Sequence, residues 1–320
     1  MATVGEAEVF MRHGCDDVFI AYPLWLDDDR ARRLRDLADL GRVAIAVDSV
    51  EGAANAGRRL GGSDIEVLVE VDSGHHRTGV PAAEAGPVGV AAERSGVRVR
   101  GAFTFPGHGY SPGQAARVAR AERDALTAAA TSLRSHGLRV DVLSGGSTPT
   151  LTASLGTDLA TPPDRADGRA DGRADGRADD WADDAALLEL RPGVYVFGDA
   201  QQWELGASPS DIALTCSATV VSHAGGRLVL DAGSKVLGAD RAAYATGYGR
   251  LLEHPEARVV MLSEHHAVVD LDGAPLPPLG SRVSVVPNHV CAAVNLADEL
   301  WVDEAGGLRP WPVSARGCNA

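Results

Sequence analysis

The sequence predicts an α/β protein, in which a parallel (β/α)8 barrel that lacks its first strand is followed by a separate antiparallel β domain. Two observations support this fold class. Up to about residue 205, short apolar runs alternate with helical stretches, as in βα units with buried strands. After that point the pattern changes to alternating strands separated by glycine turns. We therefore expect a barrel domain at 1–205 and a β domain at 206–320.

The composition fits this size and excludes several classes of protein. A chain of 320 residues with 45% hydrophobic residues can form one large domain and a smaller one. The net charge of −14 argues against nucleic-acid binding, which requires a basic face. No segment reaches the ~18 apolar residues of a membrane span, and the start lacks the layout of a signal peptide. We expect a cytoplasmic protein with no membrane partner, whose scattered cysteines are free thiols and not disulfides, with Cys291 as an exception considered below.

Six complete strands are expected in the barrel domain. They are VFIAYPL (18–24), VAIAVDS (43–49), EVLVEVDSG (66–74), GAFTFPG (101–107), VDVLSGG (140–146) and LELRPG (188–193). Helical spacing marks 27–40, 50–60, 81–95 and 113–136 between them. Because a (β/α)8 barrel has eight strands, we expect the opening ATV to be the tip of a seventh strand, followed by a helix from about Glu6, and one strand to be absent. A six-stranded open sheet is the alternative.

Residues 164–180 are a four-residue repeat of Ala, Asp, Gly and Arg. The repeat has no apolar periodicity and its charges balance locally, which predicts a disordered surface insertion. It falls between the last two barrel strands and should loop out without breaking the fold. We assign it no function.

Polar side chains follow the expected barrel strands, where the functional residues of this fold lie. They include His75, His76, Arg77, His108, Tyr110, Ser147, Thr148, Arg191 and Gly193. An arginine, a Ser/Thr/Gly turn and a Gly-containing loop on one rim suit an anionic phosphate ester. In the SGGST turn (144–148), paired glycines let backbone amides approach a ligand, and Ser147 or Thr148 could cap the following helix, whose N-terminus attracts phosphate. An ordinary tight turn is the alternative.

A second candidate site is the VVPNHVC segment, which contains His289 and Cys291. At the end of a strand, a His-x-Cys pair would place both side chains on one face. Imidazole nitrogen and thiolate sulfur together suit Zn²⁺. A buried thiol beside a core histidine is the alternative, and His265 and His266 could be further ligands or a plain polar turn.

These segments together resemble the D-serine dehydratase-like and D-threonine aldolase-like family, relatives of alanine racemase. The resemblance rests on ATVGEAE, DDVFIAYPL, VEVDSGHHRTGV, TFPGHGY, SGGSTPT, ELRPGVYVFGD, LDAGSKVLGAD, LSEHH and PNHVCAAVNL. It implies a pyridoxal 5'-phosphate barrel of fold type III, a C-terminal β domain, and a homodimer whose site lies where domains of two subunits meet. The substrate it implies is a small D-amino acid with a β-hydroxyl group.

The same resemblance assigns expected roles to individual residues. Arg77 would contact the phenolic oxygen of the cofactor, and Arg191 could face its pyridine nitrogen. Residues that would hold the phosphate are Ser147, Thr148, Gly193 and Val194, while His108 and Tyr110 would line the pocket. His289 and Cys291 match the metal ligands and would act in catalysis through the metal, which is expected to be zinc, with manganese as the alternative.

Two reactions fit this layout. Removal of the Cα proton would expel hydroxide and lead to a keto acid and ammonia, as in D-serine dehydratases. Removal of the β-hydroxyl proton would instead break the Cα–Cβ bond and give glycine and an aldehyde, as in D-threonine aldolases. We favour dehydration because the His-x-Cys pair resembles the dehydratase pattern. A racemase is a remote third reading, which the metal pair disfavours.

The chain departs from the family in its lysines. The family's Schiff-base lysine lies in an RPHxKTHK-like segment, which would precede residue 1, and the strand count points to the same gap. Either the natural protein is longer, or the product is truncated and does not catalyse the reaction. The lone lysine, Lys235, lies in the β domain and is a poor substitute; we expect a structural role for it.

Overall fold

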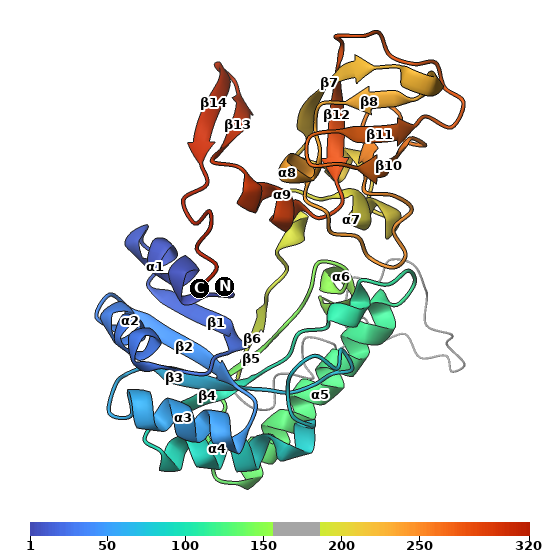
Figure 1. Ribbon diagram of the computed structural model, residues 1–320. Coiled ribbons are helices and arrows are strands. Elements are labelled where there is room, and N and C mark those ends of the chain that lie inside the picture. Colours follow the sequence, from blue (N-terminus) through green and yellow to red (C-terminus); the bar gives the residue numbers. More distant parts are fainter. Residues whose placement is uncertain (156–185) are drawn as a thin grey trace, which may run out of the picture. The chain divides into compact units, whose positions relative to one another are not determined.

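The computed structural model describes residues 1–155 and 186–320, so the predicted insertion at 164–180 lies outside the described residues. The described chain forms two compact units, Met1–Pro192 with Cys318–Ala320, and Gly193–Gly317 (Figure 1). The boundary between the two units thus lies at Pro192/Gly193, earlier than the expected division after residue 205. The reason is that residues just before and within α7 (Ala200–Glu204) bond to the second unit, for example from Gln201 N to Asn288 O at 3.3 Å. No helix in the described part of the chain is both long and apolar enough to cross a membrane.

The first unit is built on a six-stranded parallel sheet whose strands follow chain order. Its strands are β1 (Asp17–Pro23), β2 (Arg42–Val47), β3 (Glu66–Glu70), β4 (Arg98–Phe103), β5 (Val142–Gly145) and β6 (Leu187–Leu190). The helices are α1 (Val4–Arg12), α2 (Asp28–Ala38), α3 (Val50–Leu60), α4 (Ala85–Arg94), α5 (Ala115–Ser135) and α6 (Leu151–Ser154). All six expected strands and the four expected helices are confirmed, as the βα half of a barrel.

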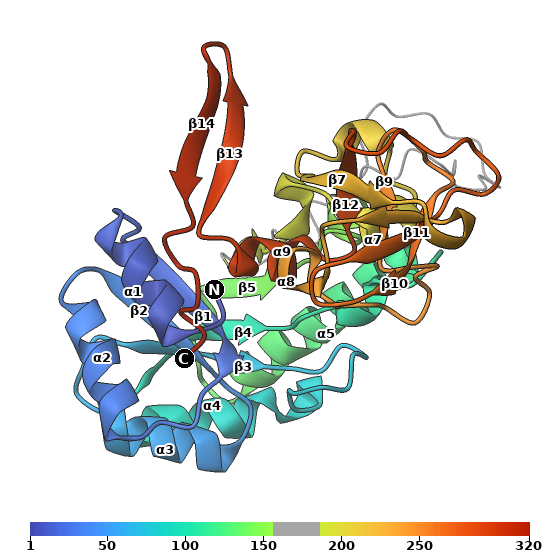
Figure 2. The ribbon, with the colours of Figure 1, turned by 45° about the horizontal axis from the view of Figure 1, so that its top comes forward.

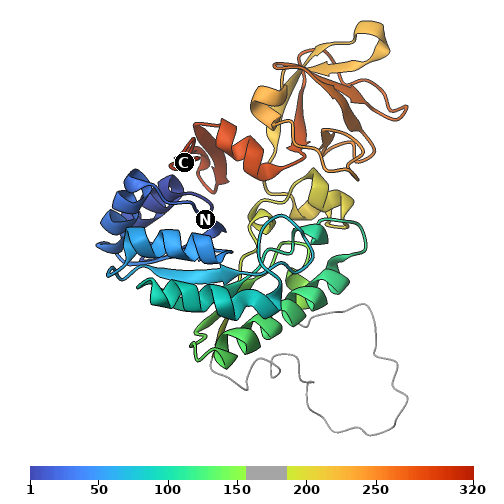
Figure 3. The same cartoon turned by 60° about the horizontal axis from the view of Figure 1, so that its bottom comes forward.

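The strands are apolar on both faces because each face is buried. Val43, Ile45 and Val47 of β2 belong to the large core against the helices, which Figure 3 shows over the outer face of the sheet. The alternate residues Ala44 and Ala46 join a smaller cluster with Leu68, Phe103 and Val142 on the opposite face. This alternation explains why the runs read as continuous hydrophobic segments.

The expected strand at the opening ATV is wrong. Thr3 instead caps α1, accepting a bond from Glu6 N at 3.1 Å, while the Glu6 side chain accepts a bond from Thr3 N. This capping box starts the helix at Val4. Met1 still runs beside β1, since its amino group donates to Phe19 O and its carbonyl accepts from Ala21 N.

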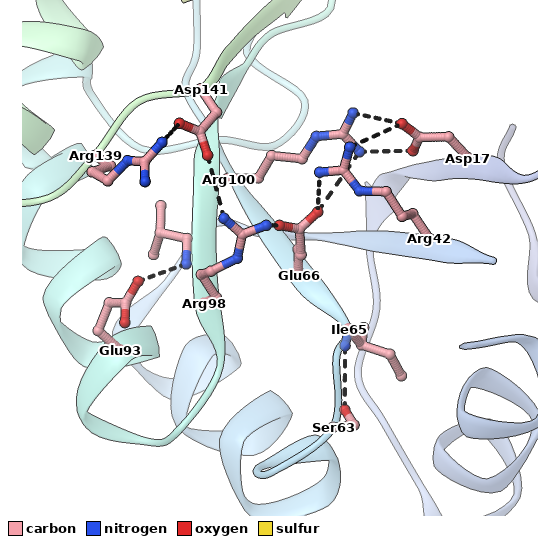
Figure 4. Close-up of polar contacts among 11 residues, drawn as sticks. Asp17, Arg42, Ser63, Ile65, Glu66, Glu93, Arg98, Arg100, Arg139 and Asp141 are labelled. Atoms are coloured by element: carbon pink, nitrogen blue, oxygen red, sulfur yellow. Dashed lines mark hydrogen bonds and ion pairs between the residues drawn. The ribbon is translucent and has the colours of Figure 1, made fainter. Parts of the chain in front are cut away.

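Charged residues gather at the amino-terminal edge of the sheet (Figure 4). Asp17, Arg42, Glu66 and Arg98 begin β1 to β4, and together with Arg100 we call them the amino-edge ion cluster. The buried Arg100 guanidinium binds both Asp17 oxygens, at 2.8 and 2.9 Å, and Arg42 bonds to Glu66 at 3.0 Å. This edge of a barrel serves stability, and the functional residues of this fold lie at the opposite, carboxyl-terminal ends of the strands.

The second unit contains a closed antiparallel barrel in the order β10-β11-β8-β7-β12-β9. Its strands are β7 (Cys216–Ser222), β8 (Leu228–Leu230), β9 (Gly249–Leu251), β10 (Arg258–Leu262), β11 (Ala267–Asp270) and β12 (Arg282–Pro287), with helices α8 (Ser234–Leu237) and α9 (Val290–Leu296). The hairpin β13 (Glu299–Glu304) and β14 (Gly307–Pro312) forms its own two-stranded sheet (Figure 2).

The predicted β domain is confirmed, with one correction to its turns. The AGG turn (224–226) joins the paired strands β7 and β8, as expected. The LDG turn (271–273) is not a hairpin, because β11 pairs with β8 and β10 and not with the strand that follows it. Asp272 and Gly273 both adopt positive φ there and send the chain away from β11.

Candidate functional site

Arg191 is the central charged side chain at the carboxyl-terminal edge of the sheet. Its Nε donates to Ser144 Oγ at 2.7 Å, and its Nη2 donates to Thr104 O at 2.6 Å. The guanidinium also lies 5.4 Å from the Phe103 ring centre and 5.8 Å from that of Phe19. Burial lowers the pKa of Arg191 from its usual value. Ring faces and fixed acceptors therefore hold a cation in a set orientation at the strand ends.

The SGGST turn is packed tightly against its neighbours. A Cβ at Gly145 would lie 2.1 Å from Glu122 Oε1, so any larger residue there would have to displace the buried Glu122 carboxylate. Gly146 adopts a φ of 85°, a conformation that glycine tolerates. The Gly145 carbonyl accepts from Arg191 N at 2.7 Å, and Gly146 N donates to Glu122 Oε1. The paired glycines thus allow a close approach of backbone to neighbouring groups.

The expected helix cap in this turn is wrong. The residue that precedes α6 is Thr150, and its side chain makes no cap hydrogen bond to that helix. Instead Thr150 Oγ1 accepts from Ser147 N at 3.0 Å and lies 3.0 Å from Ser147 Oγ. Thr148 lies in the turn between these two residues. The hydroxyl pair fixes the turn itself, while α6 is a single turn of helix.

Two histidines come together from the loops after β3 and β4. The His75 and His108 rings stack with centres 6.4 Å apart, and His75 meets Phe105 edge-on at 5.7 Å. Arg77 is exposed and its guanidinium carbon lies 5.1 Å from the Phe105 ring centre. Burial is the main cause that lowers the pKa of both histidines. Both imidazoles are therefore neutral at pH 7 and able to accept a proton.

These residues fit a cofactor that carries a phosphate and a polar ring. The buried His108 Nδ1 has no hydrogen-bond partner among the described residues. Arg191 supplies a fixed cation, and in the SGGST turn Thr148 is the residue that is partly exposed. Tyr110 follows the short 3-10 helix Gly107–Gly109 that carries His108. The predicted phosphate contacts Gly193 and Val194 belong to the second unit, at the start of the 3-10 helix Val194–Val196.

The predicted metal pair lies where a strand gives way to a helix. Strand β12 ends at Pro287, His289 is the N-cap of α9, and Cys291 is exposed in the first turn of that helix. The expectation that strand alternation aligns the two side chains is therefore wrong. The junction brings them together instead, and the Cys291 thiol is one of the groups that raise the pKa of His289.

Asp199 completes the surroundings of His289. This carboxylate is 1% exposed and its Oδ2 lies 3.5 Å from His289 Nδ1. It also accepts from Gln202 N at 2.8 Å and from Val290 N at 3.2 Å. Asp199 and the thiol together raise the pKa of His289 to about 10. A metal that binds this imidazole must displace its proton, so loading should release protons.

The remaining candidates lie apart from this pair. Within the described ranges, no set of three or more His, Cys, Asp or Glu side chains could hold a metal ion, so His265 and His266 do not complete a cluster. His265 Nε2 lies instead 3.5 Å from Lys235 Nζ. Lys235 is exposed on α8 and pairs with Glu264 at 2.7 Å.

Two carboxylates were missed by the reasoning from sequence. Asp199 has a readable signal, since an aspartate directly before a helix is a common N-cap, as it is for α7. Glu122 interrupts the apolar face of α5, four residues after Val118 and four before Leu126, both of which are buried. An acidic residue on an otherwise apolar helix face is expected to be buried, and a buried carboxyl needs a hydrogen-bond partner. The sequence therefore contained a signal for Glu122.

Comparisons with known proteins show which family the chain resembles. The family described as "Alanine racemase, N-terminal domain" matches residues 1–160, and a domain family named for serine dehydratases matches 213–302. The D-threo-3-hydroxyaspartate dehydratase of Delftia sp. is 30% identical over 322 residues, which cover 91% of this chain and 77% of that protein. The crystal structure of D-threonine aldolase from Filomicrobium marinum aligns with a TM-score of 0.79 at 27% identity, covering 99% of this chain and 81% of that chain.

Solved structures of two variants of a D-threo-3-hydroxyaspartate dehydratase are also similar to this chain. A cysteine-to-alanine variant, described as being in the metal-free form, aligns at a TM-score of 0.79 and 28% identity and covers 97% of this chain and 82% of that chain. A second solved variant replaces a histidine two positions before that cysteine. The spacing is that of the histidine and cysteine described above.

Proposed function

Because the chain belongs to the D-serine dehydratase-like and D-threonine aldolase-like family of alanine racemase-related, fold-type III pyridoxal-phosphate enzymes, we propose that it dehydrates β-hydroxy D-amino acids to keto acids and ammonia. The observation that carries the dehydration is the His289–Cys291 pair backed by the buried Asp199. D-Serine is the simplest substrate of this class, and D-threonine and 3-hydroxyaspartate share its β-hydroxyl group.

The first unit would hold the cofactor. Pyridoxal 5'-phosphate, when bound, makes the Cα proton of an attached amino acid acidic, because its pyridine ring withdraws electrons. Ser147 and Thr148 would hold the phosphate, and Arg77 would contact the phenolic oxygen. Arg191, fixed by Ser144 Oγ and Thr104 O, would face the ring nitrogen as a cation that does not move. His108 keeps an unpartnered Nδ1 that can accept a proton.

The second unit would hold the metal. A thiolate beside an imidazole is a ligand set that favours zinc over manganese, which prefers oxygen ligands. A metal at His289 and Cys291 would act as a Lewis acid toward the substrate's β-oxygen, which assists loss of hydroxide. Asp199 would orient the imidazole from behind, as carboxylates do in many zinc sites. The metal-free cysteine variant of the dehydratase relative supports this use of the pair.

Two other functions are each favoured by a specific observation. Similarity to D-threonine aldolase over 99% of this chain favours retro-aldol cleavage to glycine and an aldehyde. The lone Lys235, engaged by Glu264, favours a protein that binds cofactor and metal without turnover. We also propose that the protein is a homodimer, which sedimentation analysis at several concentrations would test.

The deciding experiment is a product assay with purified protein, pyridoxal phosphate and zinc. D-Serine, D-threonine and D-threo-3-hydroxyaspartate are supplied in turn, and keto acid, ammonia, glycine and aldehyde are measured. We expect keto acid and ammonia in equal amounts, and loss of both in His289→Ala and Cys291→Ala. Glycine with aldehyde would establish the aldolase instead. Bound cofactor without product, and no borohydride-trapped adduct at Lys235, would show that this chain binds the cofactor without turnover.

A further inference from the structure

Glu122 stands out among the buried charged groups because it lies beneath the SGGST turn. It projects from α5 and is 3% exposed. Its Oε1 accepts the Gly146 N–H, while its Oε2 is buried and has no hydrogen-bond partner within the described residues. A cavity of about 10 Å³ beside it, lined also by Ala119 and Leu126, has room for at most one water. Such a group is costly to bury and calls for an explanation.

The contact of Glu122 fixes one particular peptide group. The Gly145 carbonyl and the Gly146 N–H belong to the same peptide, whose oxygen accepts from Arg191 N at 2.7 Å and whose N–H donates to Glu122. This peptide is therefore held at both ends. A larger residue at Gly146 would be strained because its φ is positive, and one at Gly145 would push the Glu122 carboxylate aside. The orientation of the turn thus depends on its partners and not on side chains of its own.

The same peptide connects two predicted cofactor contacts. On one side it leads to Ser147, which is 1% exposed and is fixed by Thr150. On the other side its oxygen holds the backbone of Arg191, whose guanidinium is fixed by Ser144 and Thr104. Rotation of the peptide would move both the turn and the arginine. The placement of the SGGST turn relative to Arg191 therefore depends on the hydrogen bond that Glu122 accepts from Gly146 N.

We propose that Glu122 is a positioning residue, which holds the Gly145–Gly146 peptide so that the turn and Arg191 receive the phosphorylated cofactor together. This inference rests on the proposed use of the SGGST turn as the phosphate site. Glu122 does not touch the cofactor. It acts through Gly146 N and, by way of the shared peptide, through Arg191 N.

The test compares binding of pyridoxal 5'-phosphate with binding of pyridoxal, which lacks the phosphate. Absorbance titrations give both dissociation constants for the wild type, Glu122→Leu and Glu122→Gln. Loss of one positioning hydrogen bond should weaken phosphate-dependent binding about tenfold in Glu122→Leu. Pyridoxal binding should change by less than about twofold, because the Arg191 guanidinium that would face the ring is also held by Ser144 Oγ and Thr104 O. The preference for the phosphorylated form should therefore fall by a factor of about five or more. Glu122→Gln keeps an acceptor for Gly146 N and should retain the preference within about twofold.

A matched control separates positioning from general loss of stability. Leu133 is fully buried on the same helix but lies away from the turn, so Leu133→Ala should destabilise the unit and leave the preference intact. An unchanged preference in Glu122→Leu, or an equal loss in Glu122→Gln, would overturn the inference. A wild type without any preference would overturn the phosphate site and the inference with it. If the preference for pyridoxal 5'-phosphate over pyridoxal depends on Glu122 but D-serine is not turned over, only the proposed reaction is overturned and the inference stands.

Discussion

The free energy of unfolding should fall with rising pH because of Glu122. Burial is the main cause that raises the pKa of this carboxyl from 4.5 to about 7, while the hydrogen bond from Gly146 N and the charges of Arg191 and Arg123 act in the opposite direction. Between these two values the folded protein keeps a proton that the unfolded chain releases. The stability contributed by this group is therefore fully present below pH 4.5 and is lost as the pH rises through about 7.

The size of the effect follows from the same two values. Each unit of pKa corresponds to about 1.4 kcal/mol, so a rise from 4.5 to about 7 corresponds to about 3 kcal/mol of unfolding free energy. Glu122→Gln removes the titration and keeps an acceptor for Gly146 N. The difference in unfolding free energy between Glu122→Gln and the wild type should thus shift by about 3 kcal/mol in favour of the variant from pH 4.5 to pH 8.

Urea denaturation followed by circular dichroism at 222 nm would measure this difference. The signal reports the first unit, because the long helices α2 to α5 all lie there. His75 and His108 titrate in a nearby range with the opposite sign, since burial lowers their pKa. Their contribution is common to both proteins and cancels in the comparison. A difference that stays constant from pH 4.5 to pH 8 would refute the assignment of a neutral buried acid to Glu122.

Three further predictions concern stability and metal binding. Gly145→Ala would place a Cβ 2.1 Å from Glu122 Oε1, and we expect a loss of about 2 kcal/mol or more in urea denaturation; a loss near zero would show that the turn can shift. Arg100→Met should cost about 1–3 kcal/mol by urea denaturation, because two charge-assisted hydrogen bonds to Asp17 are lost while Asp17 stays partly exposed and keeps Arg42 as a neighbour; no loss would show that these bonds add nothing to stability. Asp199→Asn should weaken zinc binding about 10–100-fold by calorimetry, through loss of the carboxylate behind His289. An unchanged zinc affinity in Asp199→Asn would exclude that role.

The strands and helices of the first unit could be predicted because apolar runs and helical spacing alternate clearly along this part of the sequence. Each strand of the sheet is buried on both faces, so its residues appear in the sequence as an uninterrupted apolar run, and each helix shows its own spacing. The opening ATV misled the prediction because three apolar or β-branched residues are too few to separate a strand from a helix start. Thr3 and Glu6 form a capping box, a signal that would have given the helix boundary.

The candidate site was predictable only in part. The rule that functional residues follow barrel strands selected Arg191, the SGGST turn and the two loops that carry His75 and His108. Glu122 could not be selected in this way, because it lies in the middle of a helix and meets Gly146 only after α5 packs on the sheet. Its position on an apolar helix face was the one available clue.

The sequence by itself determined the order of the strands and helices and the division into an α/β part and a β part, and it selected His289 and Cys291 as neighbours. These features depend on neighbours along the chain, where periodicity and turn chemistry act. Only the tertiary structure decided that Asp199 lies behind His289 and that Glu122 and Arg191 hold opposite ends of one peptide. Those contacts join residues far apart in the chain, and their strength comes from burial, which no local pattern specifies.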